Sequence, residues 1–183
     1  MDTRRGVEVK NEHPIVAFYR GHRPDARGRH LPTILAWPPR ELENVHDYIQ
    51  WLFPTVEPSA VNPGAPLLTD EVIAAFRSDE HLRHALVHAL DVMLSFLGLH
   101  RGHVNGMTRI IRAPNWEERR IVWLRPGNHN HLRITRMLTS LRALGCEAEA
   151  QAFMDCLSDI HANERPNRID WETWDYWLAA AGR

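Results

Sequence analysis

The chain has 183 residues, of which 44% are hydrophobic and 25% charged, and its formal net charge is −1 at pH 7. This balance excludes an intrinsically disordered chain and fits one globular domain of ordinary size. A net charge near zero provides no global field to attract nucleic acid, which disfavours nucleic acid as a partner.

The N-terminal residues 1–12 are polar and lack the apolar segment of a signal peptide. We expect a flexible tail over residues 1–12 and one domain over residues 13–183. No run approaches the roughly 18 apolar residues of a membrane span. Cys146 and Cys156 lie ten residues apart in one predicted helix, about 15 Å of rise, which is too far for a disulfide. Unpaired thiols are typical of a reducing compartment, so we expect a soluble cytoplasmic protein.

The first half of the domain is predicted to contain helices joined by Pro-rich loops. Residues 21–39 are rich in Gly, Pro, Arg and His, which indicates a loop. Residues 41–53 place apolar side chains on one helical face and are followed by Pro54, so they predict one helix that ends there. After a second loop over residues 55–68, Thr69 caps another helix.

Residues 78–97 predict the longest helix, because apolar side chains recur at i, i+3 and i+4 and Gly98 follows. The next region, residues 99–127, is harder to interpret. Its apolar runs at 109–112 and 120–125 fit either short strands or buried loop.

Residues 128–145 carry signals for both ends of a helix. Asn128 or Asn130 can cap its start, and Gly145 suits the left-handed residue after its end. The inward stripe at helical spacing consists of Ile134, Met137, Leu138, Leu141 and Leu144.

The polar face of this helix is unusual. His129, His131, Arg133 and Arg136 gather at the end where the helix dipole is already positive, and no acidic residue accompanies them.

Two further helices are expected, over residues 147–161 and after Asp170. In the last helix Trp171, Trp174 and Leu178 share one face, which favours a core position, with a partner-binding groove as the alternative. The whole pattern predicts an all-α fold: a single compact multi-helix domain with long Pro-rich loops.

The sequence offers no catalytic, cofactor or metal motif. His81, His84 and His88 share a helical stripe, but Ala85 stands where a zinc peptidase has its glutamate, so a solvated face is favoured. Phosphate-binding, dinucleotide and nucleophile-elbow motifs are also missing. We therefore expect no cofactor and favour a non-enzymatic role.

One local charge feature is distinctive. Residues 119–145 contain no Asp or Glu. The segment holds six arginines: Arg119, Arg120, Arg125, Arg133, Arg136 and Arg142. Two guanidinium groups beside free helix amides can hold a carboxylate or phosphate. Alternatively, these arginines form structural ion pairs with acids elsewhere, such as Glu41, Glu43, Asp47 or Asp175.

Several motifs occur in the order found in one family. They are Phe18-Tyr19-Arg20, residues 48–54 (YIQWLFP), Pro66-Leu67 to Phe76, Asn115-Trp116, His129-Asn130, residues 132–136 (LRITR) and the positions from Leu138 to Gly145. On these motifs the chain resembles the conserved N-terminal domain of the opioid growth factor receptor family over most of residues 15–160. It looks like a short stand-alone member, and residues 117–126 look like an insertion.

The resemblance implies a soluble, mainly helical domain that in animal members serves as a receptor for an enkephalin peptide. It supplies no catalytic residues. Our first hypothesis is a non-enzymatic domain that recognises a peptide or acidic protein partner. The alternative is an enzyme or sensor for a small anion, such as a nucleotide or phosphorylated metabolite, bound at the start of the 129–144 helix. The expected ligand-binding residues are Arg133, Arg136, His129, Asn130, Tyr48 and Trp51.

Overall fold

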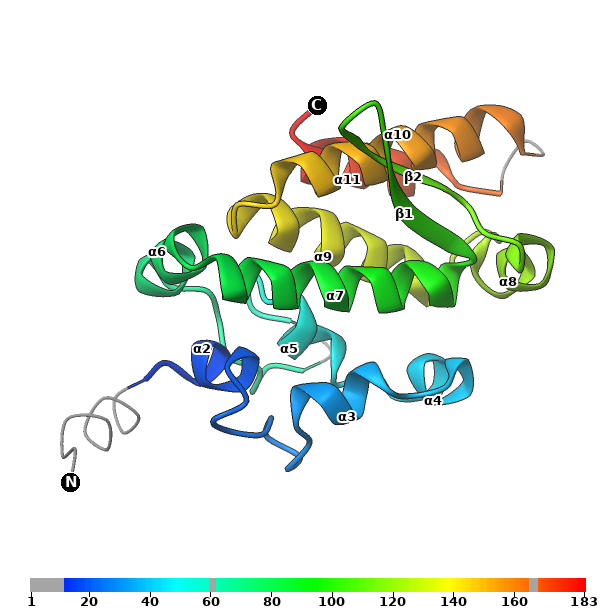
Figure 1. Cartoon of the computed structure of the whole chain (residues 1–183). Coiled ribbons are helices and arrows are strands. Elements are labelled where there is room, and N and C mark those ends of the chain that lie inside the picture. Colours follow the sequence, from blue (N-terminus) through cyan, green and yellow to red (C-terminus); the bar gives the residue numbers. More distant parts are fainter. Residues whose placement is uncertain (1–11, 60–61, 165–167) are drawn as a thin grey trace, which may run out of the picture. The chain divides into compact units, whose positions relative to one another are not determined.

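The computed structural model describes residues 12–59, 62–164 and 168–183. The predicted tail over residues 1–12 therefore lies almost wholly outside the described residues. In the described part the chain forms ten helices and one two-stranded sheet (Figure 1). A mainly helical fold is confirmed, whereas a strictly all-α fold is wrong because of the sheet. None of the described helices is long and apolar enough to cross a membrane.

The chain divides into two compact units, one up to Leu86 and one from Val87 onward. The single domain expected over residues 13–183 stays a prediction. The first unit contains α2 (Pro14–Tyr19), α3 (Leu31–Leu35), α4 (Pro39–Asn44), α5 (Ile49–Leu52), α6 (Asp70–Ser78) and the beginning of α7 (Glu80–Leu97). The second unit contains the rest of α7, β1 (Leu99–Val104), β2 (Met107–Arg112), α8 (Trp116–Trp123), α9 (His129–Ala143), α10 (Glu147–Asn163) and α11 (Trp171–Ala181).

Aromatic side chains form the core of the first unit. The ring of Phe18 lies 5.4 Å from that of Trp51, and the ring of Tyr19 lies 5.0 Å from that of Phe76. The hydroxyl of Tyr19 also donates a hydrogen bond to the carbonyl of Leu52. These contacts join α2 to α5 and α6, so short helices of little intrinsic stability are held by packing.

The helix predicted over residues 41–53 is wrong, because α4 ends at Asn44 and α5 begins only at Ile49. Val45 adopts an extended conformation that interrupts the helix. The chain then turns so that the ring of Tyr48 packs against Trp37 at 5.4 Å and its hydroxyl donates to the carbonyl of Leu42 at 2.9 Å. These two contacts hold Tyr48 in place where the helix is interrupted.

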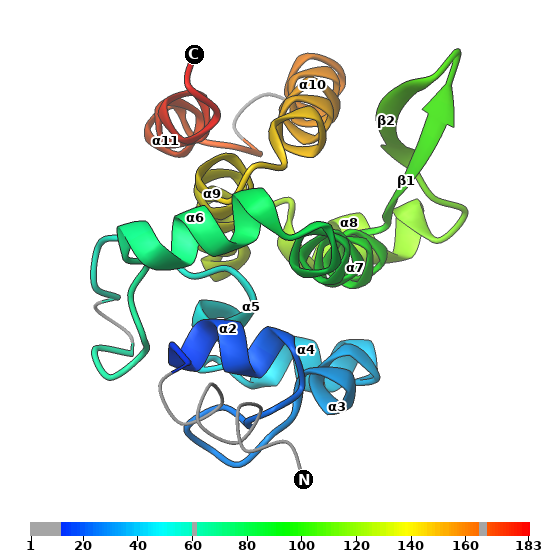
Figure 2. The ribbon, with the colours of Figure 1, turned by 60° about the vertical axis from the view of Figure 1, so that its left-hand side comes forward.

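In the second unit α9 contacts α8, α10 and α11, as Figure 2 shows for α10 and α11. Its predicted apolar stripe is fully buried, and Gly145 follows with a φ of +87°, so both predictions are confirmed. The contacts of α9 make it the central helix of this unit.

The predicted core face of the last helix was wrong in part. Trp177 is buried, whereas Trp171 is 76% exposed. The indole nitrogen of Trp177 donates to the carbonyl of His131 at 3.2 Å. A buried indole N–H needs a hydrogen-bond acceptor. The face of α11 that carries Trp177 is buried because the carbonyl of His131 accepts this bond.

The region over residues 99–127 contains a hairpin followed by a helix. Asn105 and Gly106, with φ values of 52° and 76°, form the two-residue turn between β1 and β2. Residues 109–112 are in a strand, as one interpretation expected, but residues 120–123 belong to α8. Glu117 and Glu118 occupy the first turn of α8, where the helix dipole favours acids, and Ile121 is left exposed.

Candidate functional site at the start of α9

The start of α9 is built by Asn128. Its Oδ1 accepts a hydrogen bond from the backbone N–H of Asn130 at 2.9 Å, which caps the helix. Its Nδ2 donates to the carbonyl of Val122 at 2.9 Å and so ties the cap to α8. Of the two asparagines that the sequence offered as caps, Asn128 has this role.

Arg133 lies one turn into α9 and is held by Asn130. Its Nη1 donates to the Oδ1 of Asn130 at 3.0 Å, and the two residues are only 5% and 0% exposed. The first turn of α9 has no acidic residue. The guanidinium group is therefore oriented near the positive end of the helix dipole by a neutral side chain.

His131 lies on a buried face, which differs from its expected position on the polar face. Its ring lies 6.4 Å from that of Trp123 and 5.4 Å from that of Trp177. The Nε2–H donates to the carbonyl of Trp123 at 3.0 Å. Burial lowers the pKa of the imidazole, outweighing this hydrogen bond. His131 is therefore a neutral packing residue at physiological pH.

The outer side of the same helix carries a mixed cationic and apolar surface. His129 and Arg136 are half-buried, and Leu132 between them is 67% exposed. These positions are three or four residues apart and so lie on one side of α9. Arg is one of the side chains enriched at the contact centres of protein interfaces, and the exposed Leu132 adds apolar area beside Arg136.

The two aromatic residues of the expected site belong to the first unit. Tyr48 is fully buried between Leu42 and Trp37, and Trp51 packs against Phe18. Both side chains thus have packing functions in their own unit. Their participation in ligand binding stays a prediction.

Asp47 was one of the acids considered as structural partners for the arginines of residues 119–145. It bonds instead to two arginines of the first unit. Its carboxylate accepts from Arg27 at 3.0 Å and from Arg29 at 2.8 Å. Asp25 is also engaged by Arg29, at 2.6 Å. This cluster organises the loop that precedes α3.

The histidine stripe of α7 is exposed to solvent. His84 approaches Glu80 at 3.4 Å, and no group of three or more His, Cys, Asp or Glu side chains among the described residues is placed to hold a metal ion.

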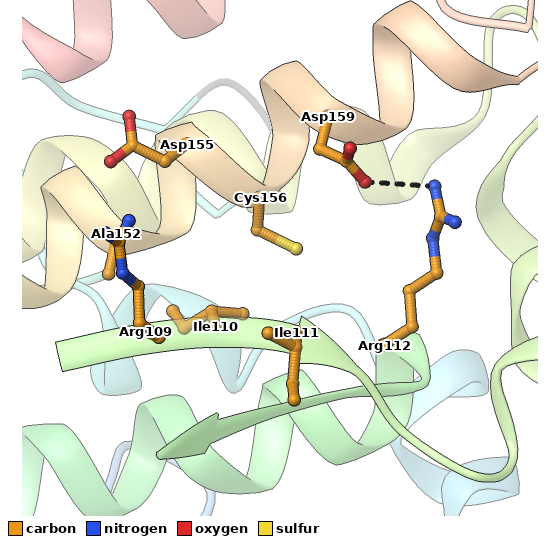
Figure 3. Close-up of a pocket in the computed structure, with 8 residues that line it drawn as sticks. All are labelled: Arg109, Ile110, Ile111, Arg112, Ala152, Asp155, Cys156 and Asp159. Atoms are coloured by element: carbon orange, nitrogen blue, oxygen red, sulfur yellow. Dashed lines mark ion pairs between the residues drawn. The ribbon is translucent and has the colours of Figure 1, made fainter. Parts of the chain in front are cut away.

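A second surface feature, which we did not predict from the sequence, is a groove of about 460 Å³ between β2 and α10 (Figure 3). Arg109 and Arg112 point from β2 toward α10, and Cys156 points from α10 toward β2. Burial raises the pKa of the Cys156 thiol to about 12, so it is not a nucleophile at physiological pH. The Asn105-Gly106 pair between apolar runs was the one signal for this hairpin.

Comparison with known proteins extends these observations. The model of the family described as the opioid growth factor receptor (OGFr) conserved region matches residues 36–181. The chain belongs to the opioid growth factor receptor family. It is 45% identical over 140 residues to the opioid growth factor receptor of Rattus norvegicus and 43% identical over 108 residues to that of Homo sapiens, stretches that cover 76% and 58% of this chain. No solved structure matches.

The matched stretches cover only 24% of the rat receptor and 15% of the human receptor. Opioid growth factor receptor-like protein 1 of Xenopus tropicalis is 41% identical over 107 residues, or 58% of this chain and 20% of its own length. The region shared with the opioid growth factor receptor family runs from α4 to α11, so it includes both the start of α9 and the groove beside β2.

Proposed function

We propose that this chain is a non-enzymatic binding domain that recognises a peptide or acidic protein partner at the start of α9. The observation that carries the proposal is the surface at the start of α9, where Leu132 is 67% exposed between the half-buried His129 and Arg136. The buried Arg133, held by Asn130, adds positive charge in the same turns of the helix, so this surface can contact both acidic and apolar side chains.

The family relationship supports the same function. The rat and human relatives are named as receptors for an opioid growth factor. We propose that this chain likewise binds a short peptide, with a carboxylate of the peptide paired to the half-buried Arg136 and attracted by the positive charge of the buried Arg133. We further propose that it acts in the cytoplasm.

The test is isothermal titration calorimetry of the whole chain with an enkephalin peptide and with the same peptide amidated at its C-terminus. Amidation removes the carboxylate and should weaken binding by at least about tenfold, because charge-assisted bonds to Arg are lost. Arg136→Ala and Leu132→Ser should weaken binding of the free-acid peptide. Arg40→Ala, at an exposed position in α4, is the matched control and should not.

Equal affinity for the two peptides, or equal affinity of the Arg136→Ala and Arg40→Ala variants, would contradict the proposal. A thermal-shift series with nucleotides and phosphorylated metabolites tests the alternative of a small anionic ligand. Stabilisation by a nucleotide that Arg136→Ala abolishes, without peptide binding, would favour that alternative.

A further inference from the structure

The β1–β2 hairpin has one covered edge and one open edge. On the covered edge α10 lies along β2, and the ion pair of Arg112 with Asp159, at 3.2 Å, joins the two elements (Figure 3). On the other edge β1 has its main contacts with β2 and lies on the side of the hairpin that is turned away from α10 (Figure 2). Only its first residue, Leu99, is buried. The outer edge of β1 is therefore accessible over residues 100–104.

The backbone of this open edge has hydrogen-bonding groups that β2 does not use. The N–H of Ala113 donates to the carbonyl of Gly98, so these two residues are a bonded pair in the register of the hairpin. Bonded and non-bonded pairs alternate in an antiparallel ladder, so the N–H and C=O groups of Leu99, Arg101 and His103 point away from β2. Within the described part of the chain, no other group bonds to them. Such an edge is a template for one more strand.

The outward face of the hairpin is apolar as well. Ile110 lies on the opposite, inward face and is buried. The register places three pairs on the outward face: His100 with Ile111, Gly102 with Arg109, and Val104 with Met107. Val104, Met107 and Ile111 are 54%, 54% and 52% exposed. A solvent-facing side of an antiparallel sheet is normally polar, so this face favours contact with another molecule.

The charges of the hairpin define what an added strand must carry. Residues 92–116 contain no Asp or Glu. Arg101 makes two bonds to Asp91, at 2.9 and 2.8 Å, and Arg112 is paired with Asp159. Arg109 is exposed and takes part in no ion pair within the described chain. The arginine charge left without a counterpart is therefore that of Arg109, in the middle of the outward face.

Gly102 leaves a path from Arg109 to the open edge. The two residues are partners across the hairpin, and a Cβ added at Gly102 would meet no atom within 4 Å. Because Gly102 has no side chain, the side chain of Arg109 can extend across β1. Neighbouring strands lie about 4.8 Å apart, so a third strand beside β1 would lie about 10 Å from β2. An Arg and a Glu side chain together span this distance.

We propose that the outer edge of β1 binds an extended segment of another protein as a third strand of this sheet. Arg101 and His103 provide the backbone hydrogen bonds. The added strand presents an acidic side chain opposite Gly102, which pairs with Arg109, and an apolar side chain two residues away, which covers Val104.

A second copy of this chain is a poor occupant of the same edge. Pairing of two β1 strands around Gly102 would bring two Arg109 side chains together, and like charges on neighbouring strands are destabilising. The proposed site is separate from the start of α9 and does not depend on the function proposed there.

The test uses a phage-displayed library of randomised heptapeptides, selected on the whole chain and counter-selected on Arg109→Glu. Enriched peptides should share an acidic residue two positions from an apolar one. Synthetic copies should bind Arg109→Glu at least about tenfold more weakly than the unmodified chain. Gly102→Val, which places a side chain between Arg109 and the added strand, should also weaken binding. Arg40→Glu, the matched control, and Arg136→Ala, at the start of α9, should bind with unchanged affinity.

Hydrogen exchange measured by NMR distinguishes strand addition from simple surface contact. Binding should slow exchange of the amides of Arg101 and His103, which would then donate to the peptide. The amide of Gly102 faces β2 and serves as the internal control. Failure to enrich any peptide, enriched peptides without an acidic residue, or unchanged exchange at Arg101 and His103 would each overturn the proposal. Concentration-dependent dimerisation in sedimentation that Val104→Ser abolishes would also overturn it, since the occupant would then be a second copy.

Discussion

At the scale of single residues, Gly98 fixes the junction between α7 and β1. Its φ is +80°, and a Cβ at this position would lie 2.8 Å from the Cβ of Arg119 and 3.1 Å from the Cα of Trp116. Gly98→Ala should therefore lower the free energy of unfolding by about 2–4 kcal/mol, because strain and overpacking add.

The matched control for Gly98→Ala is Gly102→Ala. A Cβ at Gly102 meets no atom within 4 Å, so the change should be within about 0.5 kcal/mol. Urea denaturation followed by circular dichroism measures both. Equal losses in the two variants would show that the space around Gly98 is not limiting.

The sequence predicts the residues of the α9 site unevenly. Helical periodicity was sufficient to place Ile134 and Leu138 in the core, because this pattern depends only on spacing. It could not predict that His131 is buried, because the imidazole Nε2 is bonded to the carbonyl of Trp123, at the end of α8. Polar side chains are buried where a partner exists, and the partner here comes from a helix whose identity the sequence left open.

At the scale of elements, α9 depends on its cap. Asn128→Ala removes both the bond to the N–H of Asn130 and the bond to the carbonyl of Val122, and should lower the free energy of unfolding by about 1–2 kcal/mol. Asn128→Ser keeps a capping acceptor for the N–H of Asn130 and loses only the bond to the carbonyl of Val122, so its loss should be smaller.

The comparison of these two variants by chemical denaturation checks the cap itself. Asn163→Ala, near the exposed end of α10, is a control that removes bonds only to Asp159 one turn earlier. If Asn128→Ala cost no more than Asn163→Ala, the start of α9 would be held by packing alone.

The sequence predicts those elements that carry their own local signals. The cap of α11 at Asp170, which accepts from the N–H of Thr173 at 2.7 Å, was such a case. The interruption between α4 and α5 has no such local signal, because it depends on the contacts of Tyr48 with Leu42 and Trp37. Likewise the apolar run at Ile121 suggested a strand, although the acids before it favour a helix start.

At the scale of the whole molecule, the shared family region extends over parts of both compact units. It begins at residue 36 in the first unit and ends at residue 181 in the second.

Each unit also contains a histidine that the fold keeps neutral. His13 caps α2 by accepting from the N–H of Ile15 at 3.3 Å, and His131 donates to Trp123.

These two histidines make stability depend on pH in a defined window. Burial lowers the pKa of His13 and of His131 below the value of about 6.5 expected in the unfolded chain. Between the folded and unfolded pKa values the unfolded state binds more protons, so the free energy of unfolding rises with pH. The contribution is fully present above about pH 6.5 and is lost as the pH falls below it.

The expected result is a free energy of unfolding that decreases from pH 8 to pH 5, measured by urea denaturation at each pH. His131→Gln keeps a side-chain donor for the carbonyl of Trp123 but cannot be protonated, so the free energy of unfolding should decrease less between pH 8 and pH 5. His13→Asn should likewise reduce the decrease that comes from the first unit. The double variant should show the smallest decrease. The pKa values of Asp47, Asp79 and Asp170 are lowered from 3.8, so these three carboxylates titrate outside this window. A double variant with the same dependence on pH as the unmodified chain would mean that neither imidazole is kept neutral by folding.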